Sequence, residues 1–251
     1  NIRLAMNFDD PFANQLFDSL AQKFLKPKKE TKGWAVWTEG NVSFGRIGHH
    51  DGNLGQDIHS DGLTVGIDKK ITENKTVGYA INKGWQETQV GSNEANMDAA
   101  AISLMTYRSI KLKESTYFES AFGIGEMDID LERSVTDGRN KGVRKGNQLF
   151  GSLTYLLESD TEDEENNLNY YTRVDLGFTQ LGSYTETGDG TAVHYNRQNV
   201  KSASLSAGFN LRKIIEIENG ILTPLLKFEI GKDKTINSLS EAYYITDTST
   251  I

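Results

Sequence analysis

A two-residue alternation of apolar and polar side chains recurs along this 251-residue sequence and constrains its fold more than any other feature. It is clearest in "LNYYTRVDLGFT", residues 168 to 179. One side of this stretch is apolar: Leu168, Tyr170, Val174, Leu176 and Phe178. The other side is polar or small: Asn169, Arg173, Asp175, Gly177 and Thr179. Because successive side chains of a β-strand point to opposite faces, the pattern predicts strands with one apolar and one polar face.

The same period recurs in "GLTVGIDKK", "KTVGYAINKG", "NQLFGSLTYLL", "SASLSAGFNLR" and "ILTPLLKFEIG". Alternation alone fits either a soluble sheet or a membrane barrel, since the apolar face can meet a protein core or lipid. Several runs are longer than the roughly ten residues that a tilted strand needs to span a bilayer. Outward aromatic side chains would then form bands at the two interfaces. The candidates for these bands are Trp34, Tyr79, Tyr107, Tyr155, Tyr170 and Tyr184.

The lengths of the connections favour the barrel. We expect long connections at residues 48–60, at 86–97, in "VTDGRNKGVR" and in "TETGDGTAVHYNRQ". Short ones are expected in "TENK", "KLKES" and "EIENG", and only "SDTEDEENN" is longer than the alternation requires. Outer-membrane barrels have short turns at one end and long loops at the other, whereas a Greek-key sandwich has no reason to alternate in this way.

One helix is predicted ahead of the strands, over residues 9 to 27. Asp9 or Asp10 can cap it, Pro11 suits its first turn and Pro27 ends it. An apolar stripe repeats every four residues along it: Phe12, Leu16, Leu20 and Phe24. We therefore divide the chain into a helix and linker, residues 1–32, and a β-domain, residues 33–251.

Composition narrows the function. A net charge of -8 without a concentrated basic face argues against a nucleic-acid partner. The absence of cysteine excludes disulfides and thiolate metal sites. The sequence has no run of about twenty apolar residues, so no membrane-spanning helix is predicted.

Charged side chains on the polar faces of the strands are the main candidate site residues. In a barrel they would line a hydrated lumen of mixed charge, and in a soluble sheet they would form its wet face. They are Glu39, Asp68, Lys70, Glu119, Arg173, Asp175, Arg212, Lys227 and Glu229.

Catalytic and metal sites are not indicated. No Ser stands in a Gly-x-Ser-x-Gly motif, and all four histidines fall in predicted loops: His49, His50, His59 and His194. Three of these histidines lie close in sequence to Asp51, Asp57 and Asp61. Their spacing matches no defined metal site, and the acidic "SDTEDEEN" is interpreted as a solvated turn. We expect no cofactor and no bound metal.

An ordered set of segments resembles the translocator (β) domain of the bacterial autotransporter family, the type V secretion proteins. A short helix comes first, followed by "GWAVWTEGNVSFG", "DGLTVGIDKKITENKTVGYAIN", "AAAISLMTYRS", "STYFESAFGIGEMD", "LFGSLTYLLES" and "ILTPLLKFEIG". The resemblance covers roughly residues 9 to 245.

The resemblance implies an antiparallel transmembrane barrel of about twelve strands in the outer membrane, with the helix in its lumen. It also implies export and surface anchoring of an N-terminal passenger by a monomer whose partners are membrane lipid, the barrel-assembly machinery and periplasmic chaperones. About ten strands are identified in the sequence, and a C-terminal pair is expected to be missing from it. The alternatives are a barrel without a passenger, such as a porin or adhesin, and a soluble β-sandwich binding module.

Some members of this family cut their own passenger at an Asn inside the lumen. The resemblance makes Asn7 and Asn14 the candidate positions for such self-cleavage. The paired-Asn context that these members use is not found in "RLAMNFDDPFANQL". Asn14 is therefore interpreted as a polar residue of the helix surface, and we expect no enzymatic activity toward other substrates.

Overall fold

The computed structural model describes residues 33–48, 54–91, 94–136, 138–159, 166–189, 191–213, 215–217, 220–222, 224–236 and 241–245. These residues form strands and their connections. The long strands are β1 (Trp34–Ile47), β2 (Gln56–Thr72), β3 (Lys75–Val90), β4 (Ala95–Lys113), β5 (Thr116–Val135), β6 (Gly138–Glu158), β7 (Asn166–Leu181), β11 (Gln198–Lys213) and β14 (Leu225–Ile236). The predicted helix, with its stripe Phe12, Leu16, Leu20 and Phe24, lies outside the described residues.

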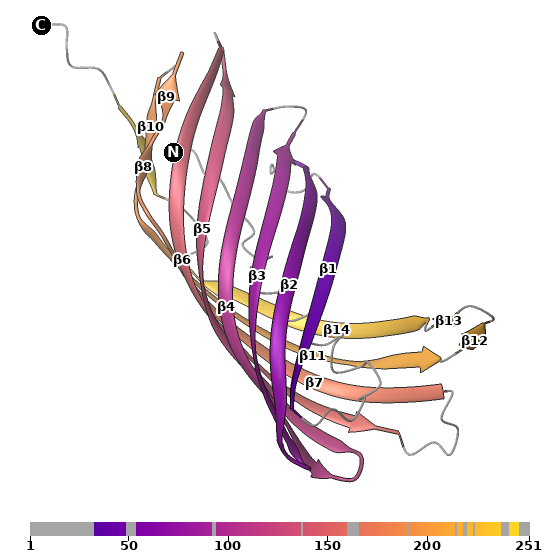
Figure 1. The fold of residues 1–251 in the computed structure, drawn as a ribbon. Coiled ribbons are helices and arrows are strands. Elements are labelled where there is room, and N and C mark those ends of the chain that lie inside the picture. Colours follow the sequence, from indigo (N-terminus) through magenta and orange to yellow (C-terminus); the bar gives the residue numbers. More distant parts are fainter. Residues whose placement is uncertain are drawn as a thin grey trace, which may run out of the picture.

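The long strands make one antiparallel sheet in the order β1-β2-β3-β4-β5-β6-β7-β11-β14. Each strand pairs with the next long strand along the chain, so the sheet is a simple meander without Greek-key crossings. Figure 1 shows that this sheet is strongly curled, with β7, β11 and β14 sweeping round from the end of the wall that β1 to β6 make. The all-β antiparallel class predicted from the two-residue alternation is confirmed.

Six short strands complete the described part of the chain: β8 (Tyr184–Thr185), β9 (Thr187–Gly188), β10 (Val193–Tyr195), β12 (Ile215–Ile217), β13 (Gly220–Leu222) and β15 (Ala242–Tyr244). β9 pairs with β6, β15-β10-β8 form a small sheet, and β12 and β13 form a hairpin. In the whole described part of the chain, no helix is long and apolar enough to cross a bilayer.

The two faces of the curled sheet differ in both chemistry and exposure. Along β5 the side chains from Ala121 to Asp130 alternate strictly between buried and exposed. The exposed set includes Phe122 and Ile124, and the buried set includes Ala121, Gly123 and Gly125. Trp37 of β1 donates to the hydroxyl of Tyr107 on β4, at 2.7 Å, across two intervening strands. Side chains of separated strands converge in this way only on the inside of a curve, so the buried face is the concave one.

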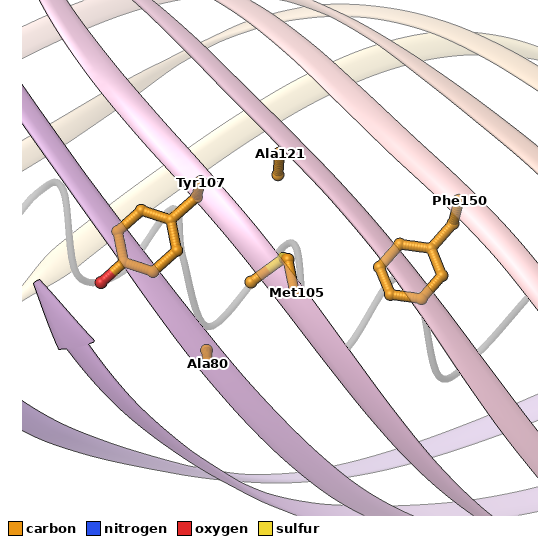
Figure 2. Packing of buried hydrophobic residues seen from close by; sticks show 5 residues of the cluster. All are labelled: Ala80, Met105, Tyr107, Ala121 and Phe150. Carbon is orange, nitrogen blue, oxygen red and sulfur yellow. The ribbon is translucent and has the colours of Figure 1, made fainter.

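Two apolar clusters lie on the concave face. The first contains Ala80, Met105, Tyr107, Ala121 and Phe150, with Trp37 packed against it (Figure 2). The second cluster contains Ala101, Met127, Ile129 and Leu181. The large aliphatic residues mostly point the other way: Leu63, Val65, Ile81, Leu104 and Leu176 are 38–56 % exposed. The apolar face of the alternation is therefore the outer surface of the sheet.

Two of the predicted long connections are mostly strand, and those predictions are wrong. β3 continues to Val90 and β4 begins at Ala95, so the proposed link over residues 86–97 is a tight turn. Gly91 in this turn has a φ of 61°, which favours glycine. Similarly, β5 continues to Val135 and β6 begins at Gly138, so most of "VTDGRNKGVR" belongs to β6.

The length of the β5–β6 hairpin explains why "VTDGRNKGVR" was wrongly predicted as a long connection. Its strands have 20 and 21 residues, about twice the length that spans a bilayer. Their outward faces change from apolar to polar within the strands, at Ile124 to Glu126 on β5 and at Leu149 to Asn147 on β6. The polar start of β6 resembled a loop in the sequence, but cross-strand pairing with β5 continues through it.

Candidate functional site: the concave face of the sheet

The strand register places all nine predicted charged residues on the concave face. In the register, Asp68 is opposite Gly78, and Gly78 is opposite Tyr107, which is buried on the concave face. Directly opposed residues point to the same face of a sheet, and so do residues two positions apart in one strand. The other eight charged residues are placed on the concave face in the same way. All nine come from β1, β2, β5, β7, β11 and β14: Glu39, Asp68, Lys70, Glu119, Arg173, Asp175, Arg212, Lys227 and Glu229. Strand pairing thus collects charges that are up to 190 positions apart in the sequence, from residue 39 to residue 229.

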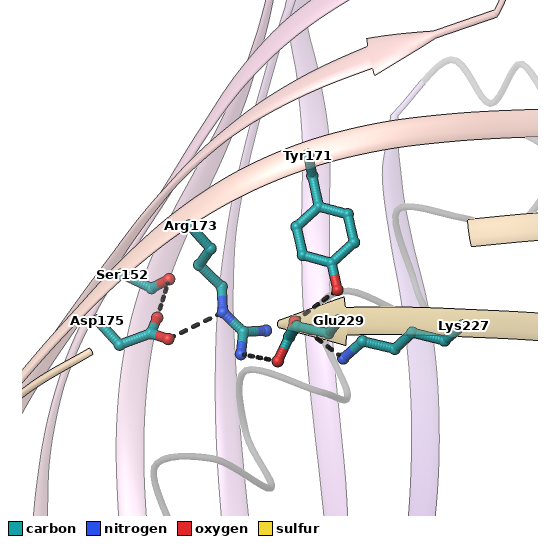
Figure 3. A network of polar contacts seen from close by, with 6 residues as sticks. All are labelled: Ser152, Tyr171, Arg173, Asp175, Lys227 and Glu229. Carbon is teal, nitrogen blue, oxygen red and sulfur yellow. Dashed lines mark hydrogen bonds and ion pairs between the residues drawn. The ribbon is translucent and has the colours of Figure 1, made fainter. Parts of the chain in front are cut away.

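Arg173 is the centre of a group of four charged side chains, shown in Figure 3. Its Nε donates to Oδ2 of Asp175 at 2.8 Å, and its Nη2 reaches Oε1 of Glu229 at 3.5 Å. Ser152 donates to the other oxygen of Asp175 at 2.5 Å. Lys227 lies 3.4 Å from Glu229, so two cations and two carboxylates balance locally.

Tyr171 reaches this group across a neighbouring strand. Its hydroxyl donates to Oε2 of Glu229 at 2.5 Å, although β11 lies between β7 and β14. The residue between them in the register is Gly208. A Cβ on Gly208 would lie 2.9 Å from the Tyr171 hydroxyl oxygen and 2.2 Å from the carbonyl oxygen of Phe228. The glycine therefore leaves the space through which the tyrosine crosses.

Tyr107 uses the same arrangement at the other side of the sheet. It crosses over Gly78 of β3 and donates to Oδ2 of Asp68 on β2 at 2.8 Å. A Cβ on Gly78 would lie 2.3 Å from the Tyr107 ring. The sequence interpretation of Tyr107 as an outward interfacial aromatic is wrong, because this side chain is 2 % exposed and lies on the concave face. Its parity with Ser103 and Met105 was the signal available in the sequence.

Between the two apolar clusters runs a row of small polar side chains, which we call the polar row: Thr64, Asn82, Ser103, Gln148 and Thr179. Consecutive strands supply them at directly opposed positions, with Gly125 between Ser103 and Gln148. All are buried, at 0–7 % exposure. Asn82 donates to Thr64 at 2.9 Å. The Ser103 hydroxyl and both amide atoms of Gln148 have no hydrogen-bond partner within the described part of the chain.

The connection between β7 and β11, residues 182–197, folds inward over the far end of β5 and β6. Glu186 is its anchor and is 5 % exposed. It accepts hydrogen bonds from Arg133 at 2.6 and 3.0 Å, from the Asn140 amide at 3.3 Å and from the backbone N–H of Val193 at 3.2 Å. The described residues of the predicted long link "TETGDGTAVHYNRQ" are therefore folded around Glu186, whose carboxylate is paired with Arg133.

Arg144 supports the same connection from β6. It is 2 % exposed, and it donates to the backbone oxygens of Gly182 at 2.8 Å and Asn196 at 3.0 Å. The guanidinium also lies over the ring of Tyr184, which stacks on Tyr195 with centroids 4.7 Å apart. Tyr184 consequently belongs to this connection, which corrects its assignment to an interfacial band.

Ion pairs also connect outward side chains of the β5–β6 hairpin. Arg139 and Lys141 of β6 both contact Glu132 of β5. Their hydrogen bonds, that from Arg139 first, hold the pKa of Glu132 below its usual range.

The two histidines among the described residues, His59 and His194, lie far apart in the fold and do not form a metal site. His59 and His194 lie in β2 and β10, which corrects their assignment to loops. His59 stacks on Phe44 with centroids 4.6 Å apart, and the neighbouring Asp57 pairs with Arg46 at 2.6 Å. The described residues contain no group of three or more His, Asp or Glu side chains that could hold a metal ion. His49, His50, Asp51, residues 160–165, Asn7 and Asn14 lie outside the described residues.

A curled antiparallel meander, apolar outside and polar inside, defines the class of transmembrane β-barrel walls. Comparison with known protein families shows to which family within this class the chain belongs. The model of the autotransporter β-domain matches residues 36–250, and the chain belongs to this family. It is therefore a translocator domain of the bacterial outer membrane, and the family implies an attached passenger. The soluble sandwich alternative is excluded.

Solved structures agree in fold. The translocator domain of the autotransporter NalP from Neisseria meningitidis superposes with a TM-score of 0.65 at 15 % identity, covering 92 % of this chain and 91 % of that one. The β-domain of the Bordetella autotransporter BrkA gives 0.63 at 14 % identity, covering 82 % and 80 %. No curated protein matches the sequence significantly.

Proposed function

We propose that the concave face lines the channel of this translocator, and that residues 1–32 occupy the channel as a helix and linker. The observation that carries the proposal is the polar row. Burial of Ser103 and Gln148 without partners costs on the order of 1–3 kcal/mol for each polar group, and water or a polar segment in a lumen removes this cost. The nine charged residues on the same face would keep the channel hydrated.

The predicted helix matches this face in both of its chemistries. Its apolar stripe, Phe12, Leu16, Leu20 and Phe24, is suited to the cluster around Met105 and Phe150. Its polar flank includes Asn14 and Gln15, whose amide groups can both donate and accept hydrogen bonds. Packing of the stripe on the cluster would bring that flank toward the polar row.

The remaining partners follow from the translocator role. An outer-membrane barrel has to cross the periplasm and insert into its membrane. We therefore propose that periplasmic chaperones and the barrel-assembly machinery are its partners, and that the finished domain is a monomer. The domain acts on no substrate, and it serves as the path and the anchor for its own passenger.

Disulfide trapping tests where the helix lies, and the absence of native cysteine makes it clean. Each stripe position is changed to Cys and combined with Ala121→Cys, on the concave face, or with the matched control Phe122→Cys on the outer face. At least one stripe position should form a disulfide with A121C, and none with F122C. Crosslinking to neither position, or to F122C alone, would refute a helix in the channel.

Single-channel conductance of a deletion variant tests the same proposal independently. Deletion of residues 1–26 should leave a folded, heat-modifiable barrel whose single-channel conductance exceeds that of the full chain. Unchanged conductance would show that these residues do not obstruct the channel.

A further inference from the structure

Arg108 is a charged side chain on the lipid-facing side of the sheet. It is exposed, and it follows the buried Tyr107 on β4, so it points outward. Its outward neighbours along β4 are mainly apolar, with Leu104 56 % and Leu112 54 % exposed. On β5 the outward side chains Phe122 and Phe118 lie opposite Thr106 and Ile110, on either side of it. An arginine surrounded by the apolar belt of a membrane barrel is costly and calls for a function.

The depth of Arg108 follows from the register. Phe118 and Tyr155 are directly opposed, with Ile110 in the same row, and they mark an aromatic band toward the end of the sheet with the two-residue turns 73–74 and 114–115. Arg108 is one step of two residues farther into the belt, which corresponds to about 5 Å along the membrane normal for a tilted strand. Its flexible stem is long enough for the guanidinium to reach phosphate at the membrane surface.

Three features make this position a site instead of a solitary charge. Ser120 of β5 accepts a hydrogen bond from Arg108 Nε at 2.9 Å, which orients the guanidinium and leaves its two terminal nitrogens free to bind a ligand. Lys69 is in the same register row, two strands away or about 10 Å, and Lys75 starts the intervening strand. Within the residues that the structure describes, none of these three cations has a carboxylate partner.

We propose that Arg108, Lys69 and Lys75 bind the headgroup phosphate of an anionic glycerophospholipid in the leaflet at the short-turn end. The bidentate geometry of guanidinium and phosphate suits Arg108, and the lysines add point charges around the same headgroup. Lys69 is also held over the ring of Trp34, at 6.0 Å from its centroid, which places this cation beside an interfacial aromatic. The site gives the barrel a preferred lipid contact on the β2–β4 side of its wall.

Native mass spectrometry of the delipidated full chain in detergent tests the proposal, with phosphatidylglycerol and phosphatidylcholine as probes. The wild type should retain phosphatidylglycerol preferentially, and Arg108→Gln should weaken this binding about fivefold, the expected effect of one cation at a membrane surface. Arg46→Gln is the matched control, because Arg46 also points outward but lies at the opposite end and pairs with Asp57. It should bind as the wild type does.

Further arms separate the explanations. Arg108→Lys should keep most of the preference, and heat modifiability reports whether each variant is folded. Arg108→Leu should raise the unfolding midpoint in phosphatidylcholine bilayers and lose the additional stabilisation that phosphatidylglycerol gives the wild type. Equal retention of the two lipids by the wild type, undiminished phosphatidylglycerol binding by folded R108Q, or displacement of the lipid by millimolar inorganic phosphate would overturn the proposal of a lipid site.

Discussion

Tyr107 and Tyr171 perform the same structural task at two places on the concave face. Each crosses a glycine of the neighbouring strand and donates to a carboxylate one strand farther on, Asp68 or Glu229. Each tyrosine thus links three successive strands through its side chain, in addition to the backbone pairing between neighbouring strands. These tyrosines therefore strengthen the curvature and the register together.

The first prediction concerns the hydroxyl of Tyr107. Tyr107→Phe removes the donor to Asp68 and the acceptor for the Trp37 indole N–H, both on buried or half-buried groups. The free energy of unfolding should fall by about 1–3 kcal/mol. Tyr79→Phe on the neighbouring strand is the control, because that side chain is 50 % exposed on the outer face, and it should change stability little. Equal effects in urea unfolding from lipid vesicles would contradict a role for the concave hydroxyl.

Among single residues, the sequence predicted side-chain direction better than side-chain contact. Parity placed Arg173, Asp175 and Glu229 on one face, but nothing in the sequence shows that Arg173 and Glu229 are 3.5 Å apart. That contact depends on the pairing order β7-β11-β14, in which the β11 residue opposite Arg173 is the small Ser206. Tyr107 was misassigned because an aromatic residue in a barrel strand suits either face.

At the scale of elements, the inward-folded connection depends on the pair formed by Glu186 and Arg133. Because Glu186 is almost fully buried, removing its charge weakens four hydrogen bonds at once. Glu186→Gln should lower the local stability of residues 182–197 by about 1–3 kcal/mol. Hydrogen exchange of this connection measures the opening free energy directly, and the exchange of β2 and β3 should not change.

Lys145→Gln is the matched control for this second prediction. Lys145 is on the β5–β6 hairpin, as Arg133 is, and it lies 3.7 Å from Asp128. Both side chains are well exposed, at 83 % and 66 %. Such pairs contribute less than about 1 kcal/mol. Exchange in residues 182–197 that stays at the wild-type rate in E186Q would show that β9 and the tyrosine stack hold the connection without the ion pair.

Elements were predicted correctly where one face is apolar and incorrectly where both faces are polar. The belt segments of β2, β3 and β7 alternate clearly and were identified. The first part of β6 carries Arg139 and Lys141 outward and Asn140 and Arg144 inward, so its alternation of apolar and polar residues disappears. Local sequence cannot distinguish such a strand from a loop, because cross-strand ion pairs, instead of burial, compensate for its polarity.

For the whole molecule, the physical problem is that the apolar rows face outward and the small polar residues face inward. Water would penalise this arrangement, since exposed rows such as Leu63, Val65 and Ile67 would remain solvated. In a bilayer the same rows are buried in lipid, and the backbone polar groups are satisfied between strands. The membrane thus supplies the apolar environment that a globular protein provides with its own core.

The third prediction tests where the membrane meets this wall. Leu104 and Asp98 both point outward from β4, six positions apart, but Leu104 lies in the apolar belt and Asp98 is beyond it, opposite Asp130. Leu104→Arg should lower the free energy of unfolding in lipid vesicles by about 2–4 kcal/mol, whereas Asp98→Arg should change it by no more than about 1 kcal/mol. The acidic neighbours of Asp98 would even favour the new cation. Similar costs at the two positions would show that the apolar belt assigned from exposure is not the bilayer-embedded part of the sheet.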